Sequence, residues 1–170
     1  MKKRSYHLIS LGCAKNIVDS NGMAQLLEKE GYFPEAEPGQ AEVLLVNTCG
    51  FIEPAREESF AVLQELARGK KEGQFLIAAG CLTQRYGQDV LEQVPGIDGL
   101  LGTRRWMDIL QVVGKIRGNE YPQPVYHLPQ AAIVGSDPPG AIGAHIQGGS
   151  AYLKIADGCR RPCAFCAIPG

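Results

Sequence analysis

The apolar positions of the chain follow two kinds of pattern in turn. Short apolar runs, typical of strands, alternate with longer segments in which apolar residues recur at the helical period. Two of the runs have no polar alternation, as expected of strands that are covered on both faces. The predicted strands lie at residues 6–12, 43–47, 75–80 and 97–102.

Capping and turn residues mark helices between these strands. Asp19 or Ser20 is expected to cap the first helix, and Gly31 is expected to end it. An alternation of strand and helix implies parallel pairing with right-handed crossovers. The sequence therefore predicts an α/β fold, with an open, mainly parallel sheet and helices on both faces. The remaining helices are predicted at about residues 54–69, 83–94 and 105–116.

The pattern changes after Gly118. Residues 119–150 hold five of the eleven prolines and five glycines, with no sustained apolar period, which is typical of a linker. One short hairpin is expected there, around Val125–Leu128, and a new strand is expected at 151–158. The predicted division is a domain at 1–118, a linker at 119–150 and the start of a second domain at 151–170.

Composition narrows the possible functions. A chain of 170 residues with 45% hydrophobic and 21% charged residues resembles an ordinary globular protein. The net charge of −1 gives no broad basic surface for nucleic acid. No apolar run approaches the roughly 18 residues that a membrane span needs, and the apolar stretch before Cys13 is too short for a signal peptide. We therefore expect a cytoplasmic protein with reduced cysteines and no membrane partner.

Three cysteines lie far apart in the sequence but in equivalent places. Cys13, Cys49 and Cys81 each come within two residues of a predicted strand end. Because the carboxyl ends of parallel strands meet at one edge of a sheet, the three thiols are expected to converge there. The alternative is that each is a small buried apolar residue, which a lone cysteine usually is. A glycine beside each cysteine favours close approach of a bulky ligand.

Three further cysteines are close together at the end of the chain. Cys159, Cys163 and Cys166 form a C-x-x-x-C-x-x-C motif, whose thiolates suit an iron–sulfur cluster. Tetrahedral zinc is the alternative, but it needs a fourth donor, and no histidine follows at a usual spacing. Three ligands on a 4Fe-4S cluster would leave one iron open, as a catalytic centre requires.

These motifs resemble a known family. The stretch "GCRRPCAFC", with the aromatic Phe165 before its third cysteine, is similar to the cluster loop of radical S-adenosylmethionine enzymes. The stretches "SLGCAKNIVDS", "VNTCGFIEPAREES" and "AAGCLTQRY" resemble the N-terminal domain of the methylthiotransferases within that group. Ala14, Lys15 and Asn16 after Cys13 favour the branch that modifies ribosomal protein number twelve of the small subunit over the branch that modifies tRNA.

The resemblance implies two 4Fe-4S clusters and S-adenosylmethionine as cofactors. One cluster would cleave S-adenosylmethionine to a radical that takes hydrogen from the β-carbon of an aspartate, and the other would carry the sulfur. Phe165 would lie beside the bound S-adenosylmethionine. The ligands implied are Cys159, Cys163 and Cys166 for the first cluster, and Cys13, Cys49 and Cys81 for the second.

The resemblance also implies partners and a missing part. The substrate would be the ribosomal protein or the ribosome, and a flavodoxin or ferredoxin would supply electrons. The chain resembles a fragment that stops at the start of the radical S-adenosylmethionine barrel, and we expect it to be inactive alone. The alternatives are a tRNA adenosine methylthiotransferase, a non-catalytic iron–sulfur module, and an α/β interaction domain with buried thiols.

Other residues near the expected edge allow simpler interpretations. Lys15, Asn16 and Asp19 follow Cys13 and could orient substrate, although helix capping explains Asp19 equally well. Trp106 is expected to pack the last helix.

Overall fold

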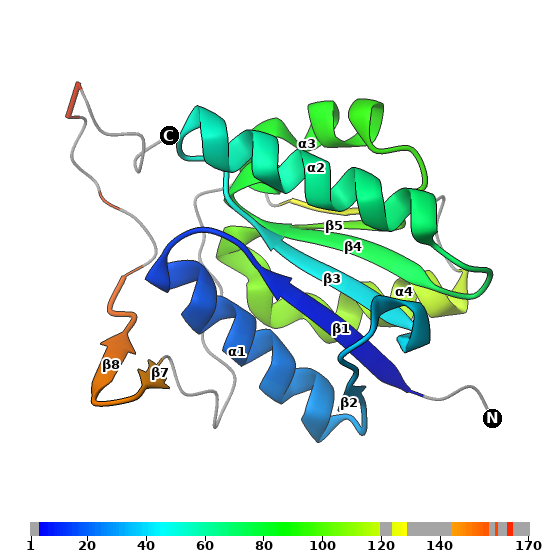
Figure 1. Ribbon diagram of the computed structural model, residues 1–170, viewed down its shortest axis with the longest axis horizontal. Helices are drawn as coiled ribbons and strands as arrows, with labels where there is room; N and C mark the ends of the chain where they lie inside the picture. Colours follow the sequence, from blue (N-terminus) through cyan, green and yellow to red (C-terminus); the bar gives the residue numbers. More distant parts are fainter. Residues whose placement is uncertain (1–3, 120–123, 129–143, 157–158, 160–162, 165–170) are drawn as a thin grey trace.

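The computed structural model describes residues 4–119, 124–128, 144–156, 159 and 163–164. Strands and helices alternate through most of this part of the chain (Figure 1). The strands are β1 (Ser5–Ser10), β2 (Phe33–Pro34), β3 (Val43–Thr48), β4 (Phe75–Gly80), β5 (Gly99–Gly102), β6 (Val125–His127), β7 (Ala144–Gln147) and β8 (Ser150–Leu153). The helices are α1 (Ala14–Lys29), α2 (Glu53–Gly69), α3 (Cys81–Gln93) and α4 (Ile109–Gly118), with 3-10 turns η1 (Pro38–Gln40) and η2 (Thr103–Asp108).

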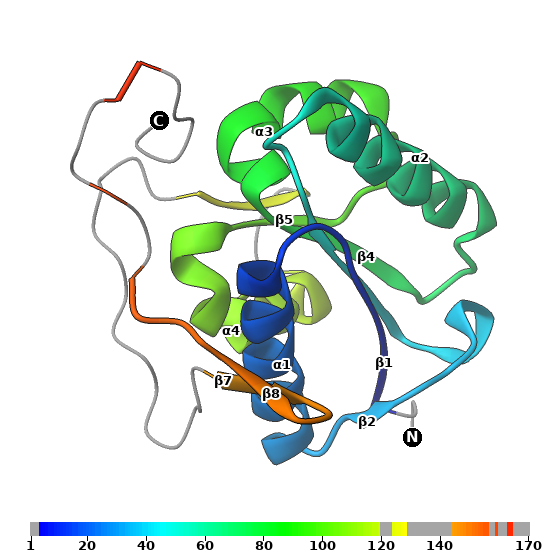
Figure 2. The same ribbon diagram turned by 60° about the vertical axis from the view of Figure 1, so that its left-hand side comes forward.

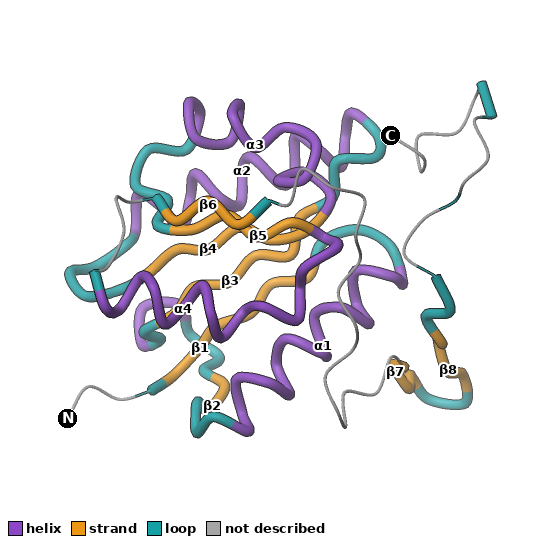
Figure 3. The backbone as a smooth tube through the Cα atoms, turned by 180° about the vertical axis from the view of Figure 1, so that it is seen from behind, coloured by secondary structure: helices purple, strands orange, loops and turns teal. Residues whose placement is uncertain are grey.

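One parallel sheet forms the centre of the molecule. Its strand order is β2-β1-β3-β4-β5-β6, and every neighbouring pair is parallel. Helices α1 and α4 cover one face, and α2 and α3 cover the other (Figures 1 and 3). The predicted fold class, an open parallel α/β sheet with helices on both faces, is confirmed.

The central strand β3 shows why the apolar runs lack alternation. Val43 and Leu45 belong to the core under α1 and α4, whereas Leu44 and Val46 belong to the core under α2 and α3. Successive side chains of a strand point to opposite faces, so a strand between two helix layers must be apolar at every position. All four side chains are at most 1% exposed.

Helix α1 begins earlier than its capping residues predicted. It starts at Ala14, directly after Cys13, so the expectation that Asp19 or Ser20 caps it is wrong. Both side chains are 2% exposed and serve tertiary contacts instead. The Ser20 hydroxyl donates to the Ser10 hydroxyl of β1 at 2.8 Å. Polar side chains of the type that caps helices are used here for contacts that pack α1 in the fold.

The segment after α4 also differs from its prediction. Val125–His127 was expected in a hairpin, but it is β6, which pairs in parallel with β5 at the edge of the sheet. The strand expected at 151–158 is shorter and lies in an antiparallel hairpin, β7–β8. This hairpin lies alongside α1 (Figure 2). None of the helices among the described residues has the length and apolar character that a bilayer crossing requires.

Candidate metal centre

The three upstream cysteines lie at the same edge of the sheet. Cys13 follows β1, Cys49 follows β3 and Cys81 follows β4, and these three strands are adjacent and parallel. The connection from β1 runs outward to β2, whereas the connection from β3 runs the other way to β4. Open α/β sheets bind ligands at such a switch point, outside the carboxyl ends of the strands. Cys13 and Cys49 flank it.

Each of these cysteines stands at or just before the start of a helix. Cys13 directly precedes α1, Cys81 is the first residue of α3, and Cys49 lies four residues before Glu53, where α2 begins. The amino-terminal end of a helix carries partial positive charge and favours anions. The arrangement therefore suits thiolates.

Ser59 of α2 fixes the backbone around Cys49. Its hydroxyl accepts the Cys49 N–H at 3.0 Å. The same hydroxyl lies 3.0 Å from the Cys49 carbonyl oxygen and 2.8 Å from that of Ala55, so it donates to either. Ser59 is completely buried. One side chain thus satisfies backbone groups that the turn after β3 would otherwise leave without a partner.

Two asparagines join the ends of β1, β3 and α1. The Asn16 amide donates to the carbonyl oxygens of Leu11 at 2.7 Å and Thr48 at 2.9 Å. The Asn47 amide donates to the Asn16 carbonyl at 2.8 Å and to the Ser20 hydroxyl at 3.0 Å. Asn16 is 1% exposed, so its amide nitrogen serves the backbone and not a substrate.

Glycines allow the cysteine turns to approach one another. Gly12 has a φ of 98°, and a Cβ there would lie 2.7 Å from the Cβ of Cys49. Gly80 has a φ of 99°, and a Cβ there would lie 2.5 Å from the carbonyl oxygen of Thr48. The close approach expected at these glycines is therefore an approach between neighbouring turns of the chain.

The thiols lie close enough to influence one another. Burial raises the pKa of Cys81, the nearby Cys49 and Cys13 thiols raise it further, and the ammonium group of Lys15 opposes the shift. The sulfur of Cys81 also lies 4.0 Å from the side-chain oxygen of Asn16. Three thiolates gathered here would repel each other, so the group favours a cationic partner over three free anions.

Access to the group differs between its members. Cys49 is buried, Cys81 is partly buried and Cys13 is exposed, so the group opens to the surface on the Cys13 side. Within the described residues, no group of three or more His, Cys, Asp or Glu side chains is arranged to hold a single metal ion. Thiolates are the ordinary ligands of iron–sulfur clusters, so the donor atoms that the three cysteines supply suit such a cluster.

The tail cysteines are only partly described. Cys159 and Cys163 are both exposed. Cys166 and Phe165, which the motif assigns to the same loop, lie outside the described residues. The assignment of this loop as a cluster site therefore stays a prediction.

A family model matches residues 5–102, which include all three upstream cysteines. Its description is "Uncharacterized protein family UPF0004". The chain belongs to this family. The match runs from the start of β1 to the end of β5, so it covers the part of the sheet that carries the candidate metal centre.

Curated relatives of the chain share one name, "Ribosomal protein uS12 methylthiotransferase RimO". The protein from Roseiflexus sp. (strain RS-1) is 42% identical over 96% of this chain, and the protein from Chloroflexus aurantiacus is 43% identical over 96% of it. The protein from Bdellovibrio bacteriovorus is 39% identical over 99% of it. The chain spans less than two fifths of each of these relatives, 38%, 38% and 36% of their lengths. These relatives are therefore similar to nearly the whole of this chain, and the chain matches only a part of each of them.

Sequence reasoning found the cysteines but missed two of the residues that support them. Asn47 stands at the end of an apolar strand, where a polar residue is a usable signal for an edge contact. Ser59 lies in the middle of α2 and gives no such signal. Its role depends on how α2 packs above the turn after β3.

Proposed function

We propose that this chain contributes the N-terminal domain and a cluster loop to a radical S-adenosylmethionine methylthiotransferase. The enzyme would attach a methylthio group to the β-carbon of an aspartate in ribosomal protein uS12. One observation carries the proposal: three cysteines distant in sequence lie at the same edge of the sheet, after the adjacent strands β1, β3 and β4. The chain that holds them is 42% identical to a protein named "Ribosomal protein uS12 methylthiotransferase RimO".

The six cysteines divide into two sets of three ligands, each for one 4Fe-4S cluster. Thiolates are the ordinary ligands of such clusters, and three of them leave one iron open. Phe165 would lie beside S-adenosylmethionine bound at the tail cluster. The proposed ligands are Cys13, Cys49 and Cys81 for the upstream cluster, and Cys159, Cys163 and Cys166 for the tail cluster.

The residues of this chain would orient the clusters. When bound, the clusters supply electron transfer and the sulfur that is inserted. Asn16, Asn47 and Ser59 hold the turns that carry the upstream thiols, so these thiols need little rearrangement on binding. Since Cys13 is the exposed member, substrate would approach the upstream cluster from its side.

The cellular location proposed for the enzyme follows from its substrate. Ribosomes place the enzyme in the cytoplasm, where cysteines stay reduced. A flavodoxin or ferredoxin would deliver the electrons. Residues 1–118 would form the methylthiotransferase domain, 119–150 a linker, and 151–170 the first strand and cluster loop of a radical S-adenosylmethionine domain. This chain alone is expected to bind at most the upstream cluster well and not to turn over substrate.

Anaerobic reconstitution with iron and sulfide tests the ligand assignment. The parent chain is expected to bind the upstream cluster well and the tail cluster at most weakly. Cys13→Ala should therefore lose most of the bound iron and sulfide, and Cys163→Ala only the remainder. S-adenosylmethionine should change the electron paramagnetic resonance spectrum of Cys13→Ala but not that of Cys163→Ala. If the parent chain binds no iron, the result would support the alternative of an interaction domain with buried thiols. Two clusters insensitive to S-adenosylmethionine would indicate an electron-transfer module.

Mass spectrometry of a deletion strain of the source organism tests the substrate. Protein uS12 from the strain is expected to lack the methylthio group, and the full-length gene should restore it. If uS12 stays modified in the deletion strain while tRNA loses its modification, the proposal is contradicted and the tRNA branch is favoured.

A further inference from the structure

A buried ion pair joins α1 to the segment that follows β8. The ammonium nitrogen of Lys154 lies 2.5 Å from a carboxylate oxygen of Asp19. The two side chains are 9% and 2% exposed. Such a pair loses its hydration, so it persists only where the geometry holds both charges firmly. Asp19, expected as a helix cap, is in fact an anchor for a segment 135 residues away.

Trp106 lies beneath this ion pair. The Lys154 nitrogen is 5.7 Å from the centre of the indole ring, and Trp106 is 4% exposed. A Cβ at Gly22 of α1 would lie 2.6 Å from the Cη2 atom of Trp106, so only glycine lets the indole pack this closely on the helix. A desolvated ammonium over an indole face is favourable. Lys154 is therefore held by a carboxylate and by an aromatic ring.

A second contact fixes the other strand of the hairpin on the same helix. The side-chain amide of Asn21 and the Nδ1 atom of His145 in β7 are hydrogen-bonded. Both strands of the hairpin lie against α1, as Figure 2 shows. The hairpin is thus bound to α1 through two polar contacts from separate strands.

We propose that the Lys154–Asp19 pair, seated on Trp106, positions the tail cysteines relative to the upstream cysteines. This inference rests on the proposed function, which gives the two sets their roles. Lys154 lies five residues before Cys159, a stretch that spans at most about 18 Å. If the chain were held only as far as Leu128, which follows β6, the 31 residues from there to Cys159 could span up to about 110 Å. Docking of Lys154 therefore limits where Cys159 can lie.

Helix α1 links this anchor to the upstream group. The helix begins directly after Cys13, and Asp19 follows six residues later, about 9 Å along the axis. One rigid element therefore carries a ligand at its start and the anchor for the tail on its second turn. A packed apolar pair would stabilise the contact equally well, but a buried ion pair specifies one register, which is its best-attested use.

Fluorescence of Trp106 tests the anchor, because it is the only tryptophan of the chain. Lys154→Met and Asp19→Asn each remove one partner of the buried ion pair, which should shift the docking equilibrium by about 100-fold or more. Acrylamide should then quench Trp106 more strongly than in the parent chain. Quenching equal to that of the parent in both variants would overturn the inference.

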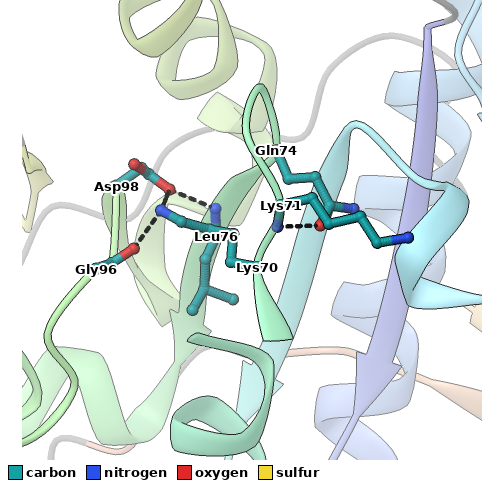
Figure 4. Close-up of polar contacts among 6 residues, drawn as sticks. All are labelled: Lys70, Lys71, Gln74, Leu76, Gly96 and Asp98. Carbon is teal, nitrogen blue, oxygen red and sulfur yellow. Dashed lines mark hydrogen bonds and ion pairs between the residues drawn. The ribbon is translucent and has the colours of Figure 1, made fainter. Parts of the chain in front are cut away.

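A second, partly buried ion pair provides a control. Lys70 lies 2.6 Å from Asp98, and their side chains are 18% and 16% exposed. Asp98 directly precedes β5 and Lys70 directly follows α2, so this pair lies near the amino ends of β4 and β5, away from the cysteines at the carboxyl ends. Figure 4 shows the pair together with Gly96. Lys70→Met is expected to destabilise the fold without changing the quenching of Trp106. A rise in quenching as large as that in Lys154→Met would show a general loosening and contradict the anchor.

A double variant separates positioning from stability. Asp19→Asn with Lys154→Met removes both charges, so its stability should return close to that of the parent. Spin labels on Cys13 and Cys159, with the remaining cysteines replaced by serine, should nevertheless show a broader distance distribution than in the parent. A distribution equal to the parent's would refute a positioning role. The metal-free chain is used, so this result does not depend on whether the clusters bind.

Discussion

Gly80 offers the sharpest test of the way the upstream cysteines are held. It joins β4 to α3 directly before Cys81, with φ 99° and ψ −158°, a conformation essentially restricted to glycine. A Cβ at this position would lie 2.5 Å from the Thr48 carbonyl oxygen and would also overlap the side-chain oxygen of Asn47. Gly80→Ala therefore combines backbone strain with steric overlap.

Both effects have known magnitudes. Strain of this kind costs about 1–3 kcal/mol, and forcing an extra carbon into packed surroundings costs about 1–3 kcal/mol more. A domain of this size is stable by about 5–15 kcal/mol, so the melting temperature should fall by about 10 °C or more. The overlap moves the end of β3 away from α3, which separates Cys49 from Cys81. Iron binding at the upstream group should fall with it.

Two other glycines serve as controls for thermal denaturation of the metal-free chain. Gly96 has a φ of 96° but nothing within 4 Å of a Cβ, so Gly96→Ala reports strain alone. Gly69 ends α2 with open space around it, so Gly69→Ala should change little. Gly80→Ala should be the least stable of the three and the only one to lose iron. A melting temperature equal to that of Gly96→Ala, with iron retained, would refute the packing argument.

Three further predictions concern single side chains. Ser59→Ala leaves the Cys49 N–H unpaired and should cost about 1–3 kcal/mol in chemical denaturation, and unchanged stability would contradict its role. The pKa of Cys81 is raised, so in the native, metal-free chain its alkylation rate should begin to rise at a higher pH than in the denatured chain. The contribution of Cys81 to stability should be lost as the pH rises above the ordinary pKa range of a thiol. Burial and a 2.8 Å hydrogen bond to Glu28 raise the pKa of Tyr6, so spectrophotometric titration should show it protonated after the other tyrosines ionise. Tyr6→Phe should cost about 1 kcal/mol.

The main features of the fold could be predicted because they follow from local rules. The uninterrupted apolar run of β3 implies two helix layers, and parallel strands bring their carboxyl ends to one edge. That edge then places Cys13, Cys49 and Cys81 near each other without any information about their contacts. Pro54 lies in the first turn of α2 and Gly69 ends the helix, as predicted, because both residues act through their own backbone.

The failures all involve contacts between distant parts of the chain. Asp19 has the composition of a cap, but its partner Lys154 is 135 residues away. The segment Val125–His127 was expected in a local hairpin, but it pairs as β6 with the open edge of β5. Ser59 meets Cys49 only after α2 has packed on the sheet. Local sequence patterns carry no information about such partners.

The fold holds the three upstream cysteines near one another without a bound metal. In small zinc domains the metal supplies most of the folding energy, and the ligands scatter without it. Here the turns are held by Asn16, Asn47 and Ser59, none of which needs a metal, and the sheet beneath them has its own core. The fold therefore does not depend on a bound metal, and ionised thiols would only add repulsion to it. Replacing cysteines should remove iron while leaving the metal-free chain folded, and this separation makes iron content a clean measure of ligand identity.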